Sequence, residues 1–200
     1  MQVVSRQRGD TIIEVLFAIT VFALVAVGGL ALMNQGTAVA QRSLEIGLVR
    51  EQIDTQTDAL RYMRDAYIAD GSGGGKATTL WQKIVGKDHT VSEADDFDSI
   101  SDGKDCALPS PGKAFALNVT KLGTDPIIQT PTPDVATYAK VRYDLPTPTA
   151  EGIWIQAVPG KPGIGQPGFY DFHVRACWHT PGQSAPITLG TIVRLYDPQA

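Results

Sequence analysis

The stretch VLFAITVFALVAVGGLALM, residues 15–33, decides the fold, because Thr20 is its only polar residue. As a helix it would be about 28 Å long, close to the thickness of the hydrocarbon core of a bilayer. It therefore predicts a membrane-spanning helix. A cleaved secretory signal, the alternative, has a shorter apolar region followed by small residues at the cleavage site. Because Arg6 and Arg8 precede the run, the positive-inside rule predicts a cytoplasmic N-terminus and an exported remainder.

The helical pattern continues beyond the apolar run. Residues 35–69 contain no proline, and apolar residues recur on one face of the expected helix, whereas mixed charges such as Glu45 occupy its flanks. A charge mixture of this kind is typical of a solvated face. The glycine-rich stretch DGSGGG, residues 70–75, ends the helix, so we expect one helix over residues 10–69. The apolar stripe consists of Ile46, Val49, Ile53, Leu60, Met63 and Tyr67.

The rest of the chain predicts β structure. Residues 70–105 are expected to be a glycine-rich linker and an acidic loop, with a short helical piece at 80–85, and residues 106–200 a β-rich globular head. The fold class is therefore α+β, with a long helix packed on an antiparallel sheet. Stretches with alternating, β-branched or aromatic residues predict strands at 114–120, 138–145, 152–158, 169–180 and 187–196.

Alternation in the stretch FYDFHVRACWH, residues 169–179, predicts which face of its strand is buried. The even-numbered residues, such as Phe172 and Trp178, are apolar and are expected on the core side. The odd-numbered residues, which include Cys177 and His179, are expected on the wetter side. The last two predicted strands are joined by a turn-rich segment and should form an antiparallel hairpin.

Glu14 is an unusual residue for its position next to the apolar run. A carboxylate near the middle of a membrane-spanning helix costs roughly 2.5 to 3.5 kcal/mol. Its presence therefore calls for a partner or a special position.

A basic leader ending in Gly9, the sequence DTIIE with Glu14 five residues after that glycine, and an apolar helix that continues as an amphipathic one resemble the precursor of a type IV pilin or pseudopilin. The resemblance covers residues 6–69. It implies that residues 1–9 are a leader that a prepilin peptidase removes after Gly9, leaving Asp10 as the first residue. It also implies a single-pass protein of the cytoplasmic membrane that later joins an extracellular filament through contacts between apolar helices.

The same resemblance implies roles for individual residues. The Glu14 carboxylate would meet the amine of a neighbouring subunit and set axial register. The alternative is that Glu14 lies near the membrane interface and extends toward headgroups. The chain departs from the family at Asp10, where an apolar residue is usual, and this carboxylate competes for the same amine. Gly28 and Gly29 are the expected points of helix flexibility, since glycine weakens a helix by about 1 kcal/mol relative to alanine.

The two cysteines, Cys106 and Cys177, fit an exported head, because a disulfide persists in an oxidising compartment. The bridge would close a long loop and stabilise the head by roughly 4.4 kcal/mol on the chain-entropy account. Two buried free thiols are the alternative.

Charge and motifs bear on the function. Only 15 of the 17 Lys and Arg residues lie after residue 9, against 21 Asp and Glu, which argues against a general phosphate-binding surface. The resemblance implies a filament subunit, and no Ser/His/Asp or Cys/His arrangement is suggested by the spacing of residues, so we expect no enzyme activity, metal or cofactor. The alternatives are a tip or minor pilin whose head binds DNA or a host surface, through a cluster of Lys140, Arg142, Arg175 and Arg194, and a pseudopilin of a type II secretion-like machine.

Three other motifs give weak signals. His173, Cys177 and His179 share a strand face and would be metal ligands, but three ligands from one strand rarely complete a tetrahedral site. The stretch DDFDSISDG, residues 95–103, lacks the ligand spacing of a calcium loop. The sequence Asn118-Val119-Thr120 matches a glycosylation sequon.

Overall fold

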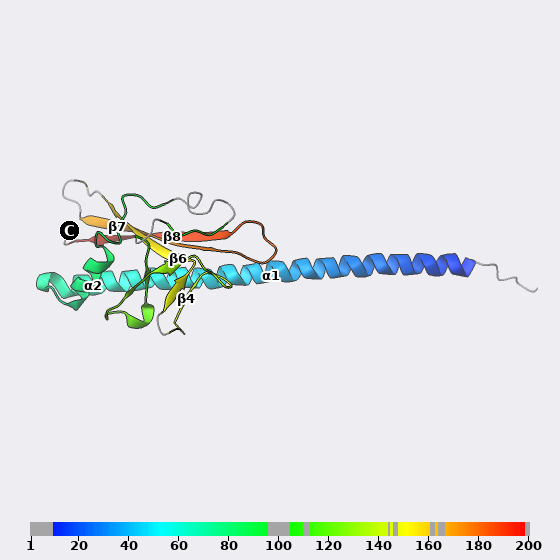
Figure 1. Cartoon of the computed structure of the whole chain (residues 1–200), viewed down its shortest axis with the longest axis horizontal. Helices are drawn as coiled ribbons and strands as arrows, with labels where there is room; N and C mark the ends of the chain where they lie inside the picture. The colour runs from blue at the N-terminus through cyan, green and yellow to red at the C-terminus, as the bar shows by residue number, and fades with distance from the viewer. Residues whose placement is uncertain are drawn as a thin grey trace, which may run out of the picture. The chain divides into compact units, whose positions relative to one another are not determined.

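The computed structural model has the expected α+β arrangement of one long helix, a short second helix and small β-sheets (Figure 1). The structure describes residues 10–95, 105–109, 113–143, 145, 148–160, 163 and 167–198.

The long helix α1 runs without interruption from Asp10 to Asp70 and contains 61 residues. The chain divides into two compact units, Met1–Ser43 and Leu44–Ala200. The second unit, called the head below, thus begins inside α1 and not after it. This corrects the expected boundary near residue 70, and the reason is that the apolar stripe of α1 is part of the core of the head.

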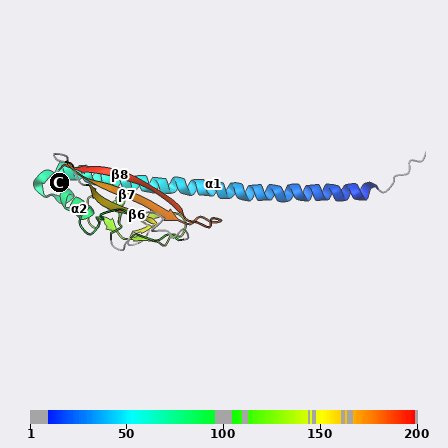
Figure 2. The ribbon, with the colours of Figure 1, turned by 90° about the horizontal axis from the view of Figure 1, so that it is seen from above.

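The main sheet of the head has three antiparallel strands, β6 (Ile153–Gly160), β7 (Gly168–Trp178) and β8 (Ile187–Asp197). They lie side by side in the order β6–β7–β8 (Figure 2). All three were expected within one or two residues, and the predicted terminal hairpin is confirmed by eleven consecutive pairs between β7 and β8.

The core of the head joins α1 to this sheet. Five of the six stripe residues on α1 are buried, with Val49 and Leu60 fully inaccessible, and Ile46 is partly buried. The stripe belongs to the same apolar cluster as Phe172 and Trp178 of β7. The predicted inward face of β7 is therefore confirmed. Complete burial of one such side chain stabilises the fold by roughly 1.5 to 3 kcal/mol, so this stripe accounts for why the polar half of α1 belongs to the head.

The glycine-rich segment after α1 is a tight connection between two helices. Gly71 begins the 3-10 turn η1 (Gly71–Gly73) at φ +64°, and Gly74 follows at +67°, a region that favours glycine. Helix α2 (Lys76–Ile84) follows. The Asp70 carboxylate binds its first turn, because it accepts hydrogen bonds from the backbone N–H and the hydroxyl of Thr78.

Helix α2 is part of the core, which corrects the expectation of a linker over residues 70–105. Its Trp81 is 1% exposed and stacks on Tyr67 of α1, with ring centroids 5.8 Å apart. Leu80 and Ile84 are also buried. The expected helical piece at residues 80–85 is the second half of this helix.

Two small sheets complete the described part of the head. The segments expected at 114–120 and 138–145 contribute only short strands, and three further short strands, which lie in or beside proline-rich segments, were not predicted. One pair in these sheets, β3 (Pro131–Thr132) with β5 (Thr149–Glu151), is parallel, in contrast to the antiparallel main sheet. The two-stranded sheet pairs β1 (Ala116–Leu117) with β2 (Ile128–Gln129), and the 3-10 turn η2 (Val119–Lys121) follows β1. The three-stranded sheet has the order β3, β5 and β4 (Lys140–Arg142).

Candidate functional sites

The apolar part of α1 presents its side chains outward on every face. Phe17, Phe22 and Leu24 are 69%, 74% and 74% exposed, and the other large apolar side chains from Ile12 to Met33 are exposed as well. Thr20 does not break this apolar surface, because its hydroxyl donates to the carbonyl of Phe17 at 2.8 Å. This helix is long and apolar enough to cross a membrane, which agrees with the predicted span at residues 15–33.

Glu14 lies in the second turn of α1, between the exposed side chains of Ile13 and Val15. Among the described residues, none forms a hydrogen bond or an ion pair with its carboxylate. Such a group is inexpensive in water but costly in hydrocarbon. Any partner that neutralises Glu14 in an apolar environment therefore comes from beyond the described part of this chain.

Three of the other residues expected to act in maturation and assembly, Asp10, Gly28 and Gly29, lie in the same helix. Gly9 lies outside the described residues, and Asp10 is the first residue of α1. Gly28 and Gly29 are helical, and a Cβ atom at either position would meet nothing within 4 Å. Within this unit, neither glycine is required by close packing, and their role in flexibility stays a prediction.

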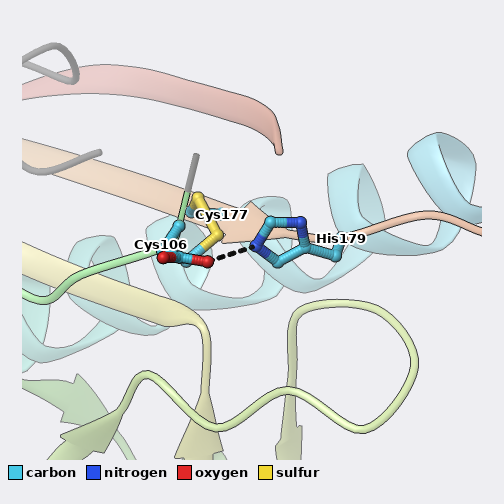
Figure 3. The surroundings of a disulfide bond; sticks show 4 residues. Cys106, Cys177 and His179 are labelled. Atoms are coloured by element: carbon cyan, nitrogen blue, oxygen red, sulfur yellow. Dashed lines mark ion pairs between the residues drawn. A yellow bond between two sulfur atoms is a disulfide. The ribbon is translucent and has the colours of Figure 1, made fainter. Parts of the chain in front are cut away.

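The head contains the predicted disulfide between Cys106 and Cys177, with Cα atoms 5.7 Å apart (Figure 3). Cys177 is 1% exposed, which corrects the expectation that it faces water. The sulfurs belong to a small second apolar cluster with Trp154, which is fully buried, and with Ala114. The disulfide thus fastens the segment around residue 106 over the outer face of the β6–β7 pair.

His179 lies next to this disulfide, with its Nε2 3.9 Å from the Asp105 carboxylate (Figure 3). The hypothesis of a metal site at His173, Cys177 and His179 is wrong, since the Cys177 sulfur is bonded to Cys106 and has no thiolate to offer. No cluster of three potential ligands occurs in the described residues. Of the acidic stretch 95–103, all but Asp95 lies outside them.

The possible glycosylation sequon is also explained by local structure. Asn118 is 2% exposed, and its side-chain oxygen accepts hydrogen bonds from the backbone N–H and the hydroxyl of Thr120. It caps the turn η2. A buried capping side chain is not accessible to a glycosyltransferase, so the sequon has a structural role here.

Sequence reasoning missed the role of Glu45. We expected it on a solvated face, but it is 6% exposed, and its carboxylate accepts hydrogen bonds from the indole N–H of Trp178 at 3.2 Å and from the hydroxyl of Thr180. Glu45 is only one residue from the stripe residue Ile46, which was the available signal. This contact fastens the start of the head-bound part of α1 to the end of β7.

Two of the four basic residues proposed to form a nucleic-acid surface are paired with carboxylates. Arg194 binds both oxygens of Asp171, at 2.8 and 2.7 Å, and Arg142 lies 3.3 Å from Glu151. The hydrogen bonds from Arg194 lower the pKa of Asp171 below its usual value. Because Lys140 and Arg142 belong to β4 whereas Arg175 and Arg194 belong to the main sheet, the four do not share one strand pair.

A polar pocket of about 540 Å³ lies between the end of α2 and the segment before β2. Lys83 and Asp125 both line it and form an ion pair of 2.5 Å. His89 lines the same pocket and packs its ring 5.2 Å from Phe115, and burial lowers the pKa of its imidazole. These groups are not arranged as a nucleophile with its base.

Comparisons of the chain with protein-family models, with curated proteins and with solved structures returned no match.

Proposed function

We propose that this protein is a structural subunit of a type IV pilus or a related extracellular filament. The observation that carries the proposal is that one continuous helix has two different surfaces. Its first part exposes apolar side chains all round, and its second part buries one stripe in a β-sheet head. A side chain such as Phe22 gains by leaving water, and either lipid or other apolar helices provide that environment.

The isolated Glu14 supports assembly over simple anchoring. As a permanent anchor the helix would gain from an apolar residue at this position, whereas a filament of packed helices offers a neighbouring subunit whose terminal amine neutralises the carboxylate. In this proposal a prepilin peptidase cuts after Gly9. The subunit then stays in the cytoplasmic membrane, with its N-terminus inside, until it is drawn into the filament.

Two more specific versions make different use of the head. A tip or minor pilin would bind DNA or a host surface through the head, and a pseudopilin would act in a type II secretion-like machine. The ion pairs of Arg142 and Arg194 reduce the positive charge that DNA binding needs, so the plain structural subunit is the version we favour. Labelling of filaments with an antibody to the head separates the versions, because a tip subunit labels only ends.

Sequencing of the mature N-terminus tests the processing step. We expect the mature chain to begin at Asp10, and we expect Gly9→Leu to leave the precursor uncut. The matched control is Gly36→Leu, at a helical glycine where an added Cβ meets nothing within 4 Å, and it should be processed normally. An unchanged mature N-terminus in the Gly9 variant would reject the family assignment.

The assembly step is tested at Glu14. Glu14→Gln should leave membrane insertion and cleavage intact but abolish or strongly reduce filaments seen by electron microscopy, because the neutral amide does not attract an amine in the same way. Glu51→Gln, at an exposed residue of the head-bound part of α1, is the control. Normal filaments from the Glu14 variant would contradict the proposed role.

A further inference from the structure

The two edges of the main sheet differ in whether their backbone groups have hydrogen-bond partners. The β6 edge is covered, since Ile155 and Phe115 exchange both backbone hydrogen bonds, at 2.6 and 3.0 Å, and Val91 donates to the carbonyl of Ala157 at 2.9 Å. The β8 edge has no strand partner among the described residues. Strand β8 is eleven residues long, and an edge of that length normally needs protection or a partner.

The direction of the backbone groups follows from the register. Cys177 donates its N–H to the carbonyl of Gly152, so odd-numbered residues of β7 face β6 and even-numbered residues face β8. The even residues pair with the odd residues of β8, for example Phe172 with Val193. The backbone groups of the even residues of β8 therefore point away from the sheet. These residues are Thr188, Gly190, Ile192, Arg194 and Tyr196, and all five are exposed.

A hydrogen bond from Arg64 agrees with the outward direction of the even-numbered residues of β8, and it occupies one end of this edge. Arg64 of α1 donates from Nε to the carbonyl of Tyr196 at 3.1 Å, which places that carbonyl on the outer side of β8. The open part of the edge therefore runs from Thr188 to Arg194.

The usual protections of an edge strand are missing from β8. It contains no proline and no lysine, and its pairing with β7 has no bulge over eleven residues. Its one arginine, Arg194, does not project from the edge, because Asp171 binds its guanidinium over the outer face, where it also lies 4.2 Å from the ring centre of Phe169. The open stretch also exposes Ile192 to 61%.

A groove of about 310 Å³ lies beside the middle of this edge. It is lined by residues of α1, among them Asp54, Asp58 and Arg61, and by the segment Thr191–Val193 of β8. Arg61 is paired with Asp58 at 2.8 Å, so the carboxylate of Asp54 gives the groove a net negative charge.

We propose that the β8 edge binds an extended segment of a partner protein, which adds a fourth strand to the sheet and places a lysine or arginine in the groove beside Asp54. In an added strand, successive side chains point to opposite faces. One set lies next to exposed Ile192 and is expected to be apolar, and the other set lies next to Thr191 and enters the acidic groove. This inference uses only residues of the head and does not depend on the proposed filament function.

Charge complementarity favours a basic partner over a second copy of this chain. If β8 of another copy paired here, the side chains on its groove side would be Leu189, Thr191 and Val193, none of which is basic. Such a pair would leave Asp54 without a counter-charge.

The test uses the full chain in detergent and a fluorescent peptide of alternating valine and threonine, with one threonine replaced by lysine. We expect measurable binding by fluorescence anisotropy, at least about tenfold weaker binding when glutamate replaces the lysine, and no binding when the amides on one edge of the peptide are N-methylated. Equal binding of the N-methylated peptide, or no binding of the lysine peptide at about 1 mM, would overturn the proposal.

Variants of the protein test the same contact from the other side. Ile192→Pro removes one outward N–H and should abolish binding, whereas Ile192→Thr keeps the backbone groups and should retain it. Asp54→Lys should reverse the preference, so that the glutamate peptide binds more tightly, and Asp134→Lys on an exposed loop is the charge control. If the proline variant fails to fold, the charge reversal decides. A dimer of the full chain that Asp54→Lys leaves intact and Ile192→Pro abolishes would assign the edge to a second copy instead.

Discussion

The indole Nε1 of Trp178 donates a hydrogen bond to the carboxylate of Glu45 at 3.2 Å, across 133 residues of sequence. Both residues are buried, and Glu45 lies at the second position of the head unit. A buried carboxylate is tolerated only when polar groups surround it, and here Trp178 and Thr180 both donate to it. Within the head, the contact therefore fastens the first turn of the head-bound part of α1 to the end of β7.

Glu45→Ala should destabilise the head by about 3 kcal/mol, because it leaves the donors of Trp178 and Thr180 buried without this acceptor. Glu45→Gln keeps one oxygen acceptor and should cost about half as much. Glu51→Ala, at an exposed position, should change stability by less than about 0.5 kcal/mol. Urea unfolding followed by tryptophan fluorescence measures the three, and equal stability of the Glu45→Ala and Glu51→Ala variants would contradict this role.

Gln56 is a second buried polar residue of α1 whose replacement should be costly. Its side-chain amide both donates to the carbonyl of Leu117 at 3.0 Å and accepts from its N–H at 2.8 Å, in the manner of a strand neighbour. Gln56→Leu should destabilise the head by about 2 to 3 kcal/mol. Gln52→Leu, which removes a single contact to the N–H of Val141, should cost about 1 kcal/mol. The reverse order in urea unfolding would show that the Leu117 contact is unimportant.

Removal of the disulfide should lower stability by up to about 4.4 kcal/mol on the chain-entropy account, because Cys106 and Cys177 are 71 residues apart. The double variant Cys106→Ala with Cys177→Ala measures the loss by denaturant unfolding. A reductant should destabilise the unmodified protein and leave the double variant unchanged. If the reductant affects both equally, its action lies elsewhere.

The stability of the head should depend on His89 in mildly acidic solution. Burial lowers the pKa of the folded-state imidazole below 6.5, and Lys113 adds to this effect while Asp88 opposes it. The unfolded chain therefore binds a proton first, so the contribution is complete above about pH 6.5 and is lost as the pH falls from there through the folded-state pKa. Burial and the nearby Arg175 lower the pKa of His173 in the same direction.

His89→Gln should therefore reduce the loss of unfolding free energy between about pH 7.5 and 5.5, and His179→Gln, at an exposed residue outside the core, is the comparison. Urea midpoints at the two pH values measure the difference. A variant at His89 with the same pH dependence as the unmodified protein would exclude its contribution.

Strong local patterns explain the successful predictions of the fold. The apolar run at residues 15–33, the stripe that includes Val49 and Leu60, and the alternation around Phe172 each repeat one signal over several turns or residue pairs, so they identify α1 and the three strands of the main sheet. The short strands β2, β3 and β5 have two or three residues each, and their proline-rich surroundings favour loops. They form because neighbouring segments supply hydrogen-bond partners that no local pattern reveals.

The sequence by itself determined the long apolar helix, its amphipathic continuation, the α+β class and the position of Glu14 within an apolar surface, because these depend on the spacing of residues along one chain. Only the tertiary structure decided that Glu45 is buried, that Cys177 belongs to an apolar cluster with Trp154, and that, among the described residues, β8 has an open edge beside Asp54. Those features arise where separate segments of the chain meet, and these are more than a hundred residues apart for Glu45 with Trp178 and for Asp54 with β8. Burial and hydrogen bonding are properties of the contact and not of either segment alone.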